Sequence, residues 1–316
     1  MDISVILWFQ EIRQALGPGF DLFASLLSDT LAYAVAVIPF ICYWCGNKNA
    51  GRRMIFALAI SMYLNQFLKV TFSIYRPWIR DARVEPSETA IASASGYSFP
   101  SAHTQVSATA YGSLAVLLKD KYRKTARLCV FLLFLTGLSR VFLGVHTPQD
   151  VAAGLTIAVI SIQIGFILAD ESGSKNRAVH ILTAAAVLTV SGIIYVIFKP
   201  YPMDYADGQL IVDPSGMIKD ALLNIGVFAG SMLGCILEEN TLRFSTEGTK
   251  KEKILRFLAG APGIAFFALF NHILPVSVLP YQLTSFLRGF LAAVYAVYVY
   301  PLLFTKYRSS KKTGKV

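Results

Sequence analysis

The stretch that decides the fold is residues 150–169, DVAAGLTIAVISIQIGFILA. Its only charged residue is the first one, and every later position is apolar or uncharged. A helix rises about 1.5 Å per residue, so twenty residues reach about 30 Å, the thickness of the hydrocarbon core of a bilayer. The stretch therefore predicts a transmembrane helix.

The composition of the rest of the chain agrees with this interpretation. Hydrophobic residues make up 55% of the 316 residues, charged residues 15%, and the mean hydropathy is +0.54. A soluble domain carries about 25% charged residues, more than this chain has. A disordered chain contains far fewer hydrophobic residues than this one. Both classes are excluded, and we predict an all-α polytopic membrane protein.

Further apolar runs extend the prediction to a helical bundle of about nine transmembrane spans. The spans are expected near residues 22–44, 54–74, 103–118, 128–145, 150–169, 179–198, 217–237, 254–273 and 285–304. We divide the chain into an amphipathic helix over 1–21, a six-span core over 22–198, and three further spans with a basic tail over 199–316. The first helix is expected to lie in the outer membrane interface and to end at Gly17-Pro18-Gly19.

The distribution of basic residues predicts the orientation. Alternate loops near residues 48–53, 119–127, 175–177 and 243–256, with the tail from residue 306, hold 20 of the 29 Lys and Arg residues. The opposite loops hold five. Basic loops stay in the cytoplasm, so we predict an external N-terminus and a cytoplasmic C-terminus. The N-terminus has no basic segment or cleavage site typical of a removable signal peptide.

Three polar clusters lie at span ends that this orientation places outside. They are KVTFSIYRP over residues 69–77, SFPSAH over 98–103 and SRVFLGVHTPQD over 139–150. Lys69 and Arg140 lie within predicted spans, where charges are costly and point to function. Lys219 and Arg288 are nearer span ends, where a long side chain can reach water.

The cations of these clusters suit a phosphate dianion. Arg76 and Arg140 offer planar forks of donors, and Lys69 offers a point charge. Lys69 and Arg76 are seven residues apart and share one helix face. The predicted helix that starts near Ser101 adds free N–H groups at its N-terminus.

The histidines beside these cations can supply a nucleophile and an acid. Of the four in the chain, His103 and His146 fall inside the clusters, and Asp150 lies four residues after His146, where it can hold the ring. His180 and His272 are assigned to packing.

No metal or other cofactor is expected. The histidines adjoin cations and no carboxylate cluster. The lone C-x-x-C of Cys42 and Cys45 lacks a second pair, so we assign it to packing, together with Cys129 and Cys235.

The order K-x6-R-P, P-S-x-H and S-R-x5-H-x3-D resembles the signature of the type 2 phosphatidic-acid phosphatase superfamily. The motifs span residues 69–150, and the predicted topology is similar to glucose-6-phosphatase and sphingosine-phosphate phosphatases. The resemblance implies an enzyme, a phosphoric ester hydrolase. It implies that His146 is the nucleophile, Asp150 orients it and His103 is the general acid. The implied phosphate-binding residues are Lys69, Arg76, Ser101, Ala102 and Arg140. The family usually has glycine where this chain has Ala102, so either an ordinary φ suffices there or the pocket is slightly tighter.

The expected reaction is metal-independent hydrolysis on the outer face through a phosphohistidine. Candidate substrates are phosphatidic acid, phosphatidylglycerol phosphate, a polyprenyl pyrophosphate, a sphingoid-base phosphate and, given the topology, a soluble sugar phosphate. Partners are therefore lipid phosphates and membrane lipids, not nucleic acid; the oligomeric state stays open. The alternatives are a phosphotransferase acting on a second lipid and a transporter that binds lipid phosphate without chemistry. The sequence has no Asn-x-Ser/Thr acceptor, which favours a bacterial inner membrane.

Overall fold

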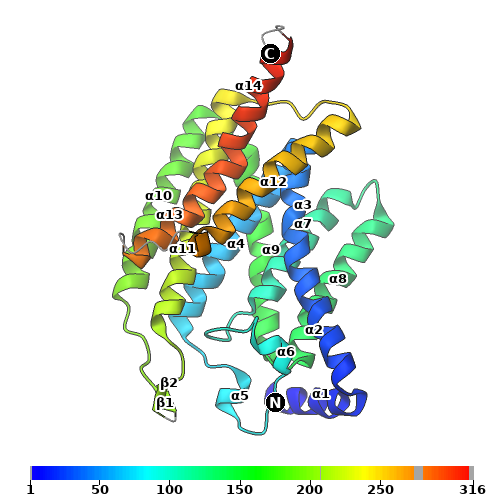
Figure 1. The fold of residues 1–316 in the computed structure, drawn as a ribbon, viewed down its shortest axis with the longest axis vertical. Coiled ribbons are helices and arrows are strands. Elements are labelled where there is room, and N and C mark those ends of the chain that lie inside the picture. The colour runs from blue at the N-terminus through cyan, green and yellow to red at the C-terminus, as the bar shows by residue number, and fades with distance from the viewer. Residues whose placement is uncertain (1, 207, 274–279, 313–316) are drawn as a thin grey trace. The chain divides into compact units, whose positions relative to one another are not determined.

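The structure, a computed structural model, describes residues 2–206, 208–273 and 280–312. Side chains are described except in 268–279 and 308–316. The described chain is helical almost throughout (Figure 1), and its one sheet pairs β1 (Tyr205–Ala206) with β2 (Gln209–Leu210) in antiparallel. The all-α class predicted from the apolar runs is confirmed.

The helices before the sheet include the long spans and several short turns. They are α1 (Asp2–Leu16), α2 (Pro18–Tyr33), η1 (Ala34–Val37), α3 (Ile38–Cys45), α4 (Lys48–Phe72), α5 (Pro77–Arg80), α6 (Glu88–Ile91), α7 (Ala102–Leu118), α8 (Arg123–Phe142), α9 (Pro148–Glu171) and α10 (Lys175–Phe198). Those after the sheet are α11 (Pro214–Leu237), η2 (Glu238–Leu242), α12 (Lys250–Ile273), α13 (Tyr281–Val294), η3 (Tyr295–Val299) and α14 (Tyr300–Lys312).

Every predicted span is helical over most of its length, although α4 ends at Phe72 and α8 at Phe142, short of the predicted ends at 74 and 145. Among the described residues, seven helical segments are long and apolar enough to cross a membrane. The other two predicted spans correspond to α7, which has 17 residues, and to α12, which contains Pro262. The count of nine membrane crossings therefore stays a prediction.

The N-terminal boundary differs from the expected one. The first helix ends at Leu16 because Gly17 adopts a φ of +81°, and Pro18 already occupies the first turn of α2. The helical segment that contains the first predicted span thus begins at Pro18, four residues before the expected start of the span, and η1 lies between α2 and α3.

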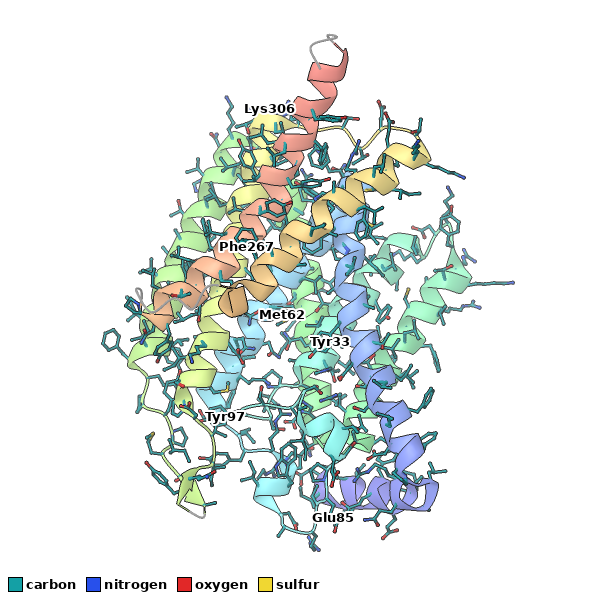
Figure 2. All side chains as sticks on the ribbon, viewed as in Figure 1. Tyr33, Met62, Glu85, Tyr97, Phe267 and Lys306 are labelled. Atoms are coloured by element: carbon teal, nitrogen blue, oxygen red, sulfur yellow. The ribbon has the colours of Figure 1, made fainter. Side chains whose placement is uncertain are left out.

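The helix α1 is bound to the loop that precedes α6. Gln10 donates to Arg83 O at 3.2 Å and accepts from Glu85 N at 2.8 Å, and Arg13 donates to Glu85 O. Figure 2 labels Glu85 beside this helix. Gln10 and Arg13 are buried, so the polar face of α1 contacts protein as well as solvent.

The chain forms two compact units. The first comprises Met1–Val37, Ser61–Gln163 and Lys199–Met217; the second comprises Ile38–Ile60, Ile164–Phe198 and Ile218–Val316. The segments expected over 22–198 and 199–316 each contribute to both units, and the division expected at residue 198 stays a prediction.

In the first unit, α2 packs against α7 and α8 through small side chains. Ala24, Ser25, Ser28 and Ala32 are all buried on one face of α2. Small residues at helix interfaces allow close approach, the usual basis of helix association in membranes. This row of small side chains brings the polar groups of α2 next to the start of α7 and the end of α8, which carry predicted site residues.

A buried polar seam fixes α7 against α4 within this unit. Gln105 Nε2 donates to Ser61 Oγ at 3.0 Å, Asn65 Nδ2 donates to Gln105 Oε1 at 2.9 Å, and Thr109 Oγ1 donates to Ser61 Oγ at 2.8 Å. Buried polar groups that satisfy one another make a rigid contact. The seam begins two residues after His103 and so holds the first turn of α7 in place.

The second unit contains its own buried ionic cluster. Glu238 is fully buried; Lys48 Nζ lies 3.2 Å from its Oε1, and Tyr43 donates its hydroxyl to Oε2 at 3.3 Å. Arg52 forms an ion pair with Glu239. Buried charges require such pairing, so this cluster has a structural explanation.

Candidate active site

The turn between α8 and α9 places His146. Gly144 adopts a φ of +73°, and the N–H groups of Val145 and His146 both donate to Arg140 O, at 3.2 and 3.3 Å. The turn therefore folds back on the last residues of α8 and carries His146 inward, where it is 1% exposed.

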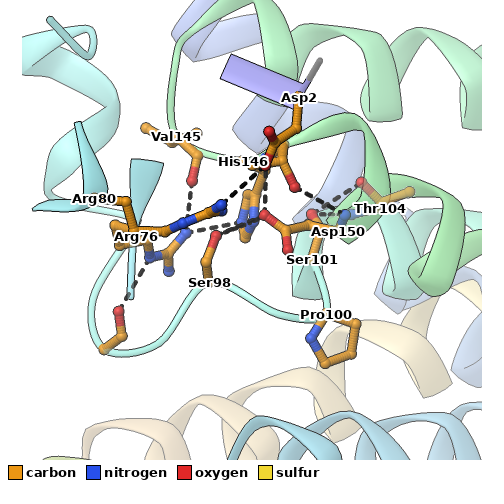
Figure 3. Close-up of polar contacts among 12 residues, drawn as sticks. Asp2, Arg76, Arg80, Ser98, Pro100, Ser101, Thr104, Val145, His146 and Asp150 are labelled. Atoms are coloured by element: carbon orange, nitrogen blue, oxygen red, sulfur yellow. Dashed lines mark hydrogen bonds and ion pairs between the residues drawn. The ribbon is translucent and has the colours of Figure 1, made fainter. Parts of the chain in front are cut away.

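The hydrogen bonds of His146 define which nitrogen holds the proton. Nη1 of Arg76 lies 2.9 Å from Nε2 (Figure 3), and a guanidinium can only donate, so Nε2 must carry the lone pair. Nδ1 faces two acceptors at 3.4 Å, Asp150 Oδ2 and Ser98 Oγ. The ring is thus the Nδ1–H tautomer, with a free electron pair directed toward a cation.

The protonation state of His146 follows from its surroundings. Burial, and after it the positive charge of Arg76, hold the pKa of His146 well below its usual range. Asp150 opposes this shift without reversing it. His146 is therefore a neutral imidazole at neutral pH, the form that can act as a nucleophile.

Asp150 is fixed by three donors at a single oxygen. Its Oδ2 accepts from Ser98 Oγ at 2.6 Å and from Thr147 N at 2.8 Å, in addition to the long contact with His146 Nδ1. Asp150 is 2% exposed at the start of α9. A carboxylate held in this way can stabilise a positive charge that develops on the ring.

Arg76 holds the surrounding loops together. Besides His146, it donates to three carbonyl oxygens: Nε to Gly96 at 3.1 Å, Nη1 to Val145 at 3.0 Å and Nη2 to Ser95 at 2.8 Å. Arg76 is 2% exposed. It therefore joins the loop before α7 to the turn that bears His146.

A second group of contacts surrounds His103 in the first turn of α7. Its Nε2 lies 3.0 Å from Asp29 Oδ1, and Nη1 of Arg140 lies 3.5 Å from the same oxygen. Arg140 also donates to Ser28 Oγ at 3.3 Å and to Ser93 Oγ at 3.5 Å. Its Nε, although buried, has no acceptor among the described protein atoms.

Ser101, Ala102 and Lys69 lie in the same unit. The N–H of Ser101 donates to Asp150 O at 3.1 Å, and its hydroxyl caps α7 by accepting from Thr104 N at 3.4 Å. Ala102 is the first residue of α7 and has ordinary helical geometry, so glycine is not needed there. Lys69 is 6% exposed in the last turn of α4.

His, Cys, Asp and Glu side chains are the candidate metal ligands in the described part of the chain. No group of three or more His, Cys, Asp or Glu side chains is arranged there to hold a metal ion. The cysteines described are free thiols. The metal-independent reaction stays a prediction. His180 is exposed on α10, and the side chain of His272 lies outside the described residues.

Sequence reasoning missed two residues that contact the predicted site. Ser98 belongs to the quoted cluster but was given no role, because the partner of its hydroxyl, Asp150, is 52 residues away. Asp29 was overlooked although it is the only charged residue between positions 22 and 44. An ionisable residue within a span is itself a functional signal.

Two family models match the chain. Residues 50–173 match the PAP2 superfamily, and residues 223–312 match the PAP2 superfamily phosphatase, transmembrane extension. Together the matches cover more than half of the chain. The first contains all eight predicted site residues, whereas Asp29 lies outside both.

Individual relatives are distant. The chain is 29% identical to the Bacitracin transport permease protein BcrC of Bacillus licheniformis over 43% of its length and 64% of that protein. It is 27% identical to Lipid phosphate phosphatase delta of Arabidopsis thaliana over 59% and 47%, respectively. It is 29% identical to Undecaprenyl-diphosphatase BcrC of Bacillus subtilis (strain 168) over 46% and 72%. The chain thus spans about half to two thirds of the first relatives it matches. No solved structure matches it.

Proposed function

Because the chain belongs to the PAP2 superfamily, we propose that it is an integral-membrane phosphatase that hydrolyses a lipid phosphate monoester or pyrophosphate. The proposal is supported by the names of several relatives, which include a lipid phosphate phosphatase, an undecaprenyl-diphosphatase and a phosphatidylglycerophosphatase. The expected substrates are phosphatidic acid, phosphatidylglycerol phosphate, a polyprenyl pyrophosphate or a sphingoid-base phosphate.

The observation that carries the proposal is the lone pair of His146 Nε2 directed at the guanidinium of Arg76, 2.9 Å away. A protein that only bound phosphate would need the cations but not a neutral imidazole whose tautomer is fixed by a buried carboxylate. A nucleophile held by an orienting group is the arrangement required for covalent catalysis.

In the proposed reaction, the cations bind the phosphoryl oxygens, Arg76 Nη1 passes its hydrogen bond from Nε2 of His146 to a phosphoryl oxygen, and the freed Nε2 attacks phosphorus. The P–O bond to the leaving oxygen breaks, and His103 gives that oxygen a proton. The phosphorylated ring is positively charged, and Asp150 stabilises it. Water then attacks phosphorus and loses a proton to His103, the P–N bond breaks, and phosphate and neutral His146 are released. Electrostatic stabilisation of the phosphoryl oxygens is the largest expected contribution.

The proposed site faces the outside of a bacterial cell membrane. The proposal rests on the charge distribution of the loops, which favours a cytoplasmic C-terminus and an external N-terminus. The site residues lie at the opposite ends of their spans from the basic loops.

The test is phosphate release by the detergent-purified protein from a panel of the four lipid substrates and a sugar phosphate. We expect His146→Ala to reduce turnover by at least about 10³-fold, since the nucleophile and with it the covalent route are lost. His180→Ala, which changes an exposed histidine, is the matched control. Residual activity within about tenfold of wild type in His146→Ala would refute the assigned nucleophile. Loss of turnover in EDTA would refute metal independence.

A further inference from the structure

The carboxylate of Asp29 lies on α2, 74 residues before the histidine that it contacts. Its Oδ1 is 3.0 Å from Nε2 of His103, within ordinary hydrogen-bond distance. The second contact of Oδ1, with Nη1 of Arg140, is longer at 3.5 Å. The shorter distance identifies His103 as the principal partner.

Burial gives this pair more weight than a surface ion pair. The side chain of His103 is 6% exposed and that of Arg140 is fully buried, whereas Asp29 is 31% exposed. Exposed pairs contribute little, but a carboxylate that contacts a buried imidazole and a buried guanidinium acts at low local dielectric. The small buried side chains of α2, including Ser28, allow the helix to approach closely enough for these contacts.

We propose that Asp29 is the positioning residue of the general acid His103. Its carboxylate accepts the Nε2–H of the imidazolium, which leaves Nδ1–H as the proton given to the leaving oxygen. When the P–O bond breaks, that proton moves to the leaving oxygen and His103 becomes the neutral Nε2–H tautomer, still held by Asp29. Nδ1 then takes a proton from the attacking water. This inference rests on the proposed phosphatase function.

The arrangement repeats, on a different helix, what Asp150 does for His146. Each histidine has one ring nitrogen beside a carboxylate, and the proposal assigns the chemistry to the other nitrogen. The two carboxylates have different proposed roles. Asp150 stabilises the positive charge that His146 gains when it attacks phosphorus, whereas Asp29 stabilises the positive charge of His103 before His103 gives up its proton. The N-terminal helices would therefore contribute directly to the chemistry, although both family matches leave them out.

The experiment compares substrates whose leaving groups differ in their need for a proton. A short-chain phosphatidic acid releases a poor alkoxide leaving group, whereas 4-nitrophenyl phosphate releases a stable phenolate. We expect Asp29→Asn to lower kcat on the phosphatidic acid about 100-fold and on 4-nitrophenyl phosphate less than about threefold, because general acid catalysis is lost only where it is needed. His103→Ala should show the same dependence on the leaving group. The matched control is Asp21→Asn, which removes another carboxylate of α2. Asp21 pairs with Arg13 at 3.5 Å, and its replacement should leave both rates unchanged.

The outcomes separate this inference from the proposed function. Equal losses on both substrates would overturn the inference and indicate a structural or phosphate-binding role, and so would unchanged rates. In the His103→Ala background, a further loss of more than about threefold from Asp29→Asn would also overturn it, since residues acting through one another are not additive. A wild-type protein that hydrolyses neither these two substrates nor any other lipid of the four-lipid panel would overturn both the function and the inference.

Discussion

Replacing Asp150 by Asn tests whether the carboxylate acts by its charge or only by its shape. The amide oxygen of Asn can keep the hydrogen bonds that Oδ2 accepts from Ser98 Oγ at 2.6 Å and Thr147 N at 2.8 Å. The turn that carries His146 should therefore stay folded. What is lost is the negative charge 3.4 Å from Nδ1, which in the proposed mechanism stabilises the phosphorylated, positively charged ring.

The magnitude follows from that distance. Two unit charges 3.4 Å apart attract by about 5 kcal/mol at an effective dielectric constant of about 20. Since about 1.4 kcal/mol corresponds to a tenfold rate change, kcat should fall between about 10³- and 10⁴-fold. KM should change little, because neutral His146 interacts only weakly with the charge before attack.

The assay is phosphate release in detergent over a range of substrate concentrations, with thermal unfolding measured on the same samples. Asp170→Asn is the matched control: Asp170 lies near the other end of α9, is half-exposed and pairs with Arg53 at 2.7 Å. Such a pair contributes no more than about 1 kcal/mol. A fall in kcat of less than about tenfold for Asp150→Asn, with unchanged unfolding, would refute the charge-based role.

Three further predictions concern protonation, the acceptor and the loop before α7. Burial and Arg76 lower the pKa of His146. ¹⁵N-histidine spectra should therefore show a neutral ring protonated at Nδ1 from about pH 8 down to below about 6.5, the pKa of an unperturbed histidine. Titration of His146 at or above a pH of about 6.5 would contradict the prediction. If water is the acceptor, turnover in ¹⁸O-water should place the label in the released phosphate. If a second lipid is the acceptor, neither the phosphorylated lipid nor the released alcohol should carry the label. Gly96→Ala should lower the free energy of unfolding by about 1–2 kcal/mol, because Gly96 has a φ of +63° and a new Cβ would meet Met217. It should also reduce activity, because the carbonyl of Gly96 accepts a hydrogen bond from Arg76. Gly216→Ala, at a position with open space around it, is the control, and equal melting temperatures for the two variants would refute the prediction.

The helices could be predicted because length and apolarity alone decide them. Residues 150–169 lie within a helix of 24 residues, and all the other predicted spans are helical as well. The error at the N-terminus concerned a boundary: Gly17 and Pro18 were correctly identified as a break, but the second helix starts at Pro18 itself. The interruption of the first span at η1 precedes Pro39, which has no N–H to donate to Val35 O, and this signal was not used.

Only those residues of the candidate site that belong to short sequence motifs could be predicted. His146 lies in the turn before α9 and Asp150 in the first turn of that helix, so a separation of only four residues keeps them close. Arg76 and His146 are 70 residues apart, and the motif order alone indicated that they meet. The pairing of Asp29 with His103 depends on how α2 packs, which no local pattern encodes.

The two arginines expected to bind phosphate are not equivalent in the structure. Arg76 donates to three backbone carbonyls at 2.8–3.1 Å, so it must keep its position if the nucleophile is to keep its own. Arg140 makes only contacts of 3.3–3.5 Å, and its buried Nε has no acceptor among the described protein atoms. A buried unsatisfied donor is costly, and an arriving phosphoryl oxygen would relieve that cost. We therefore propose that Arg140 binds the substrate most readily, whereas Arg76 orients His146 until its hydrogen bond to Nε2 passes to a phosphoryl oxygen.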